Sequence, residues 1–108
     1  MFSRNAAVVF FGFVLFLPAA AAAQDDIARG QALIEENCAG CHAAGKEGAS
    51  PLPAAPAFRT LGQRYPVANL EEALAEGIRT GHPDMPQFVF EPKEIGAIID
   101  YLQSLQGT

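Results

Sequence analysis

The sequence predicts a small all-α fold whose helices are joined by loops rich in proline and glycine. Apolar residues recur at helical spacing in three segments, and no segment shows the sustained alternation of apolar and polar residues that is typical of a strand. Between these segments, residues 45–56 and 81–86 gather proline and glycine, so we expect them to be irregular. The sequence has no internal repeat, and its length favours a single compact domain.

Residues 1–23 have the order of a secretory signal peptide. Arg4 gives a positive start, Ala6–Leu17 is an uncharged apolar run, and Pro18 leads to small residues ending at Ala23. An uncleaved membrane anchor is the alternative, since the uncharged stretch continues from Ala6 to Ala23, but the last third of that stretch is proline and alanine. We therefore expect export to the periplasm, cleavage after Ala23 and no membrane insertion of the mature chain.

The mature domain, residues 24–108, is small and acidic. A core of this size is marginal without a cross-link or a bound cofactor. Removal of Arg4 with the signal leaves 6 basic and 12 acidic side chains, a net charge of −6. This charge disfavours a nucleic-acid partner, which needs a basic face, and suits a protein partner with a basic patch.

Each expected helix has a start signal and an apolar face. Asp25-Asp26 precedes the first helix, and Pro92 suits the first position of the last. Asn69 and Glu72 form a capping-box pattern before the middle helix. One or two helical turns are expected within 58–65. In chain order the three faces are Ile27, Gly30, Leu33, Ile34 and Cys38; Leu70, Ala73, Leu74, Gly77 and Ile78; and Ile95, Ile98, Ile99, Leu102 and Leu105.

Both cysteines and one of the two histidines lie together as Cys38-x-x-Cys41-His42. A structural zinc site would need four ligands, and the mature chain offers only His82 as a further imidazole or thiol. A thioredoxin-like dithiol belongs to a βαβ pattern, which this chain lacks, and a local disulfide would close too short a loop to stabilise much. The motif is instead the attachment signature of a c-type haem. Two thiols at this spacing can add to the two haem vinyl groups, and His42 then reaches the iron.

Met85 is the expected sixth ligand of that iron. It is the only methionine outside the signal and lies in a loop stiffened by Pro83 and Pro86. His82 is the rival ligand, an open coordination position is a further alternative, and Met85 could also be an ordinary apolar filler.

These motifs together resemble those of class I (mitochondrial-type) cytochrome c, in its short bacterial periplasmic form. The resemblance covers essentially all of the mature chain. It rests on Gly30 eight residues before Cys38, on the Cys-His signature, on Asp84-Met85-Pro86, and on the closing helix with Tyr101. The four-helix cytochromes c′ carry the attachment motif near the C-terminus, so the order here argues against them.

The resemblance implies that the first and last helices cross and that loops wrap around one covalent haem. Gly30 would permit close approach to Tyr101. A proline carbonyl would accept a hydrogen bond from the ring N–H of His42, and Pro56 is the preferred match over Pro51 and Pro53.

Several further side chains are candidates for contact with the haem. Arg59, Arg64 and Tyr65 suit its propionates, although a solvated helix face is the alternative. The candidates for an apolar pocket are Phe58, Leu61, Phe88 and Phe90.

The sequence thus predicts a one-electron carrier with one haem c, rather than an enzyme. It would shuttle electrons between periplasmic or membrane redox complexes, with donor and acceptor proteins that carry basic docking patches. A haem enzyme or gas-binding module with a displaceable sixth ligand is the alternative, and a haem-free dithiol oxidoreductase is a third interpretation.

Overall fold

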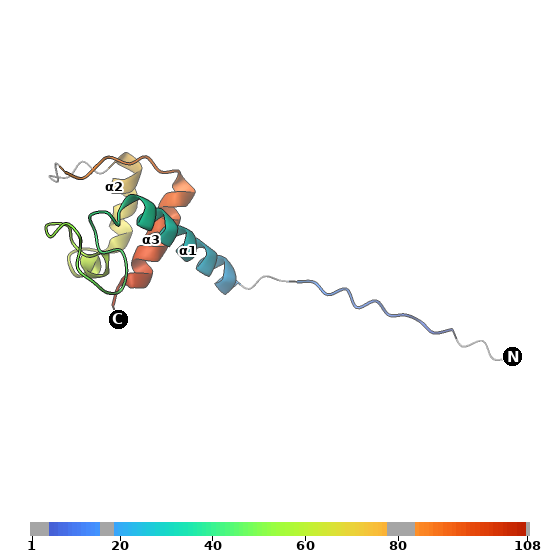
Figure 1. The fold of residues 1–108 in the computed structure, drawn as a ribbon. Helices are drawn as coiled ribbons and strands as arrows, with labels where there is room; N and C mark the ends of the chain where they lie inside the picture. Colours follow the sequence, from blue (N-terminus) through green and yellow to red (C-terminus); the bar gives the residue numbers. More distant parts are fainter. Residues whose placement is uncertain (1–4, 16–18, 78–83, 108) are drawn as a thin grey trace.

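The computed structural model describes residues 5–15, 19–77 and 84–107. Its elements in chain order are α1 (Ala19–Asn37), the 3₁₀ helices η1 (Phe58–Gln63) and η2 (Val67–Asn69), α2 (Leu70–Glu76) and α3 (Pro92–Leu105). Over the described residues there is no strand, which confirms the predicted all-α class. Figure 1 shows α1 crossing α3, with α2 beside them and the irregular loop after α1 at one end of the bundle.

Gly30 makes the crossing of α1 and α3 possible. A Cβ at this position would lie 1.9 Å from Ala97 O and 2.9 Å from Tyr101 Cβ, distances that real side chains do not tolerate. The two helix backbones are therefore in direct contact at Gly30. This confirms the expected crossing and the close approach of Gly30 to Tyr101.

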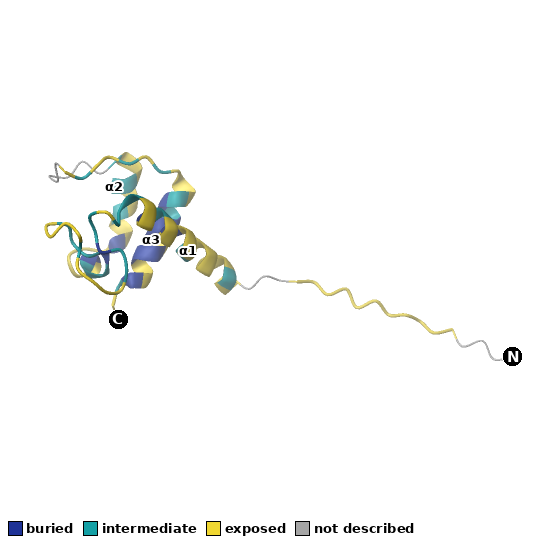
Figure 2. Cartoon of the chain, viewed as in Figure 1, coloured by how far each residue is buried: buried dark blue, intermediate teal, exposed yellow. Residues whose placement is uncertain are grey.

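The apolar face of α3 forms the centre of the core. All five residues of its predicted stripe are buried, as are Ala97 and Tyr101. Ile34 from α1 is 1% exposed and packs in the same cluster as Phe58, Leu61 and Val67. Figure 2 shows the buried positions gathered along α3 and at the turns that face it. Helix α3 is thus the element against which the others pack.

The predicted starts of α3 and of α2, at Leu70 after Asn69, were right, whereas the capping bond predicted for α2 and the start predicted for α1 were wrong. Helix α3 begins at Pro92, and Glu94 Oε1 accepts a hydrogen bond of 2.9 Å from the backbone N–H of Glu91. Asn69 does not cap α2, because it ends η2 in a helical conformation and makes no side-chain cap bond. Helix α1 begins before Asp25-Asp26, since the preceding alanines are strong helix formers.

The N-terminal segment lies outside the helical core, and α2 ends earlier than its apolar pattern predicts. Residues 5–15 are exposed, although most are apolar, and they extend away from the helices (Figure 1). No helix in the described ranges is long and apolar enough to cross a membrane. Helix α2 ends at Glu76, and Ile78, the last residue of its predicted stripe, lies outside the described residues. Cleavage after Ala23 stays a prediction.

The helix crossing predicts a position-specific effect of adding one methyl group. We expect Gly30→Ala to lower the free energy of unfolding by about 3 kcal/mol, because the new Cβ meets the backbone of α3. Gly96→Ala is the matched control, since a Cβ at this helical glycine meets nothing within 4 Å, and it should be neutral or stabilising by up to about 1 kcal/mol. Guanidinium denaturation of both variants checks this, and equal effects would contradict the crossing.

Candidate functional site

The two cysteines lie on one turn at the end of α1. The N–H of Cys38 donates to Ile34 O at 2.8 Å, which continues the helical pattern past the last residue of α1. The N–H groups of Cys41 and His42 then both donate to Cys38 O, at 3.2 and 3.0 Å. Both thiols are free and half-buried. The turn therefore presents two thiols and one imidazole from a short stretch of backbone that α1 anchors in the core.

The imidazole of His42 is held from two sides. Its Nδ1–H donates to Pro56 O at 2.8 Å, and its ring stacks on Phe58 with 4.4 Å between centroids and 25° between planes. Of the three candidate prolines, Pro56 is the one that makes this bond. Because a carbonyl only accepts, Nδ1 is the donor in this bond, and Nε2 is the ring atom that remains to bind a metal.

The backbone around His42 is tied to distant residues. Cys41 O accepts from the N–H of Leu52 at 3.0 Å, and the N–H of Ala43 donates to Ser50 Oγ at 3.0 Å. Ala44 O accepts from the hydroxyl of Tyr101 at 2.6 Å. Sequence reasoning placed Tyr101 at the helix contact but identified neither Ser50 nor Ala44, because one partner in each of these bonds is a backbone group, which carries no residue-type pattern. The irregular loop after α1 is thus fixed by hydrogen bonds.

Tyr101 is a protonated donor in this arrangement. Its side chain is 6% exposed, and burial raises the pKa of the Tyr101 hydroxyl, with the Glu35 carboxylate raising it further. The hydroxyl therefore keeps its proton at neutral pH and can donate it to Ala44 O.

Burial also keeps the thiol of Cys38 neutral. It raises the pKa of Cys38 from 9.0 to about 11, so the thiolate is scarce at neutral pH. Thiol–disulfide enzymes need the opposite, a cysteine with a lowered pKa. This environment disfavours a dithiol oxidoreductase.

A hollow of about 470 Å³ lies along the loop that holds His42. Pro56, Arg59 and Arg64 line it, whereas Tyr65 is 38% exposed and does not. Among the described residues, Arg59 Nη1 is a buried side-chain atom without a hydrogen-bond partner. A buried guanidinium nitrogen in this state calls for an anionic acceptor. Of the three residues predicted to contact the haem propionates, Arg59 and Arg64 thus line the same hollow, whereas Tyr65 does not.

The predicted sixth ligand lies in a separate segment. Met85 is half-buried within a turn, and Phe88 and Phe90, shortly after it, stack with 5.7 Å between their centroids. The rival ligand His82 lies outside the described residues. Ligation by Met85 stays a prediction.

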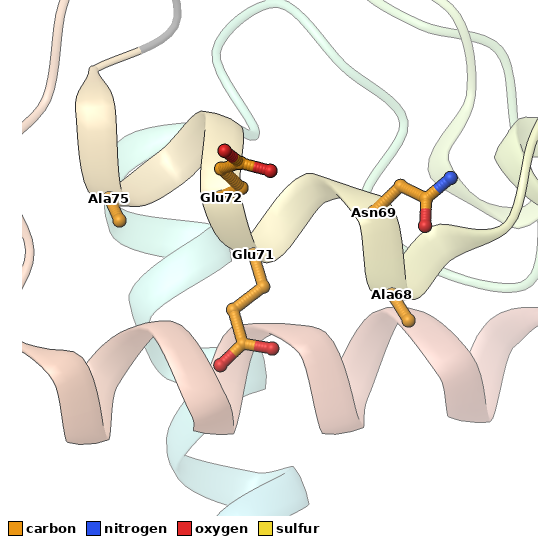
Figure 3. A pocket seen from close by; sticks show the side chains of 5 residues that line it. All are labelled: Ala68, Asn69, Glu71, Glu72 and Ala75. Carbon is orange, nitrogen blue, oxygen red and sulfur yellow. The ribbon is translucent and has the colours of Figure 1, made fainter.

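A second hollow, of about 380 Å³, is unrelated to these residues. Figure 3 shows its lining on η2 and α2, with the carboxylates of Glu71 and Glu72 pointing apart. The other lining residues are Ala68, Asn69 and Ala75, so none of the predicted site residues takes part. Across the described ranges, no group of three or more His, Cys, Asp and Glu side chains is arranged to hold a metal ion.

Comparison of the sequence with known proteins identifies a family. The cytochrome c family matches residues 27–106, a range that begins inside α1 and ends just after α3. A "Cytochrome c-553-like" protein of Synechocystis sp. is 30% identical over 102 residues, which cover 92% of this chain and 90% of that relative. No solved structure matches significantly. Because the match includes the two thiols, His42 and both crossing helices, the chain belongs to the cytochrome c family, whose members are haem-containing electron carriers.

Proposed function

We propose that this protein is a one-electron carrier with a single haem c, attached through Cys38 and Cys41 and ligated by His42 and Met85. The observation that carries the proposal is the hydrogen bond of 2.8 Å from His42 Nδ1–H to Pro56 O, directly after two free thiols. Such a bond orients an imidazole and strengthens it as a metal ligand. When bound, the haem supplies the one-electron couple of its iron.

The cysteines and Arg59 hold the cofactor at different points. Cys38 and Cys41 would hold the haem through thioether bonds, each S–H adding across one vinyl group with its proton going to the neighbouring carbon. Arg59 supplies the buried positive charge for a propionate, because its Nη1 lacks a partner within the described chain. Arg64, exposed at the same hollow, adds a weaker and screened attraction.

Met85 would supply a neutral thioether as the second ligand from the protein. A thioether and an apolar surrounding both favour the ferrous form and raise the reduction potential. With His42 and Met85 both bound to it, the haem would have no free coordination position for a substrate. This favours electron transfer over ligand chemistry.

Export follows from residues 1–23, which we propose to be a signal peptide cleaved after Ala23. The core of the domain starts further along the chain, with Ile27 packed against it and Gly30 at the crossing. Cleavage would therefore leave the fold intact. In the periplasm, the acidic mature chain would exchange electrons with donor and acceptor proteins through their basic patches.

Visible spectra of the purified protein test the proposal directly. After expression with a haem-attachment machinery, we expect a sharp reduced α-band, a weak far-red ferric band and no shift with carbon monoxide. A thiol reagent should find neither cysteine free. A spectrum that shifts readily with carbon monoxide would indicate a ligand-binding haem protein. Two titratable thiols without haem would indicate a dithiol oxidoreductase.

Substitution of Met85 tests the sixth ligand. Met85→Ala should lower the reduction potential, abolish the far-red band and open the iron to carbon monoxide, because the thioether is lost. His82→Ala is the paired variant and should change none of these three readouts. Reversed results would assign the position to His82 instead.

Substitution of Arg59 tests the propionate contact. Arg59→Gln should lower the reduction potential by about 40 mV, equivalent to about 1 kcal/mol, because a nearby positive charge favours the reduced form. Arg64→Gln removes the same charge from an exposed position and should lower the potential less, with a stronger dependence on salt. Equal shifts in the two variants, measured by redox titration, would contradict a specific role for Arg59.

A further inference from the structure

Gln106, the residue after the end of α3, joins this helix to η1 through both ends of its side-chain amide. Its Oε1 accepts from the N–H of Gly62 at 2.8 Å. Its Nε2 donates to Phe58 O at 2.9 Å and to Leu102 O at 2.7 Å. Because the acceptor and the donor end are both engaged, only one orientation of the amide satisfies all three bonds.

Gln106 approaches η1 closely at a glycine, where an added side chain would force the amide to shift. A Cβ at Gly62 would lie 2.7 Å from Gln106 Oε1, closer than non-bonded atoms allow. The absence of a side chain at Gly62, an exposed residue of η1, therefore leaves room for the Gln106 amide.

The residue that Gln106 holds is also the one that contacts His42. The N–H of Phe58 donates to Ala43 O at 3.0 Å, and its ring stacks on the imidazole at 4.4 Å. Two residues earlier, Pro56 O accepts the Nδ1–H of His42. Residues 56–58 thus make three contacts with residues 42–43, while Gln106 fixes the carbonyl at the end of this segment.

We propose that Gln106 is a positioning residue for His42. By holding Phe58 O, it fixes residues 56–58 and keeps Pro56 O at hydrogen-bond distance from Nδ1–H. That bond sets how strongly Nε2 donates to a metal, so Gln106 acts on the iron through Pro56. The proposal rests on the proposed function, in which His42 is an iron ligand.

Two substitutions separate positioning from simple packing. Gln106→Glu keeps the size and the acceptor for Gly62 N–H but, when ionised, loses the donor to Phe58 O. Gln106→Ala removes both. Gln103→Glu is the matched control for Gln106→Glu, because it introduces the same charge at an exposed position on the last turns of α3.

The readouts are hydrogen exchange and reduction potential of the haem-loaded protein. NMR of the ferrous form follows exchange of the His42 Nδ1–H alongside that of the backbone N–H of Ile98 in the buried face of α3. We expect His42 exchange to accelerate at least tenfold in both Gln106 variants, with Ile98 exchange unchanged relative to the control. The potential should rise in Gln106→Glu relative to Gln103→Glu, because a weaker Nδ1–H bond makes the imidazole a poorer ligand for ferric iron.

The contrary outcomes are distinct. Equal acceleration of His42 and Ile98 exchange would show that Gln106 only stabilises the fold, and unchanged His42 exchange would show that residues 56–58 hold their place without it. Either result overturns the positioning role. A wild-type protein whose His42 ring shows no haem-induced shift would instead overturn the proposed function, and this proposal with it.

Discussion

The contact of α1 with α3 at Gly30 is the constraint on which the site depends. Helix α1 carries the thiols and His42 at its end, so the angle and distance at which it crosses α3 decide where this turn lies. Two further bonds run from α3 to the loops, one from Tyr101 to Ala44 O and one from Gln106 to Phe58 O. One helix therefore positions both the turn that contains His42 and the segment that contacts its ring.

Backbone groups of the irregular loop after α1 are hydrogen-bonded although the loop has no regular secondary structure. Buried N–H and C=O groups cost free energy unless they are paired, and this segment has no helix or sheet to pair them. Here the N–H of Leu52 donates to Cys41 O, the N–H of Ala43 donates to Ser50 Oγ, and the N–H of Phe58 donates to Ala43 O. The buried Nη1 of Arg59 is left without a partner from the described chain, consistent with an anion supplied by the cofactor.

The parts of the fold that the sequence could predict are those with a local pattern. The stripe of α3 and its start at Pro92 follow from residue spacing, whereas the close approach at Gly30 was predicted from the resemblance to cytochrome c. The predicted cap at Asn69 failed because a 3₁₀ turn runs directly into α2, and composition does not distinguish the two helix types. Gln106 escaped prediction because its partners are backbone groups 44 and 48 residues away.

Long-range bonds of this kind link the stability of the core to the chemistry of the site. An electron carrier gains from a ligand that keeps one position in both oxidation states, because little then has to reorganise when the electron moves. Local sequence alone would leave His42 on a short turn at a helix end, where fraying is common. Pro56 and Phe58 restrain the ring, and Tyr101 and Gln106 restrain the backbone around it from the most buried helix. A change that loosens α3 should therefore disturb the position of His42 before it unfolds the domain.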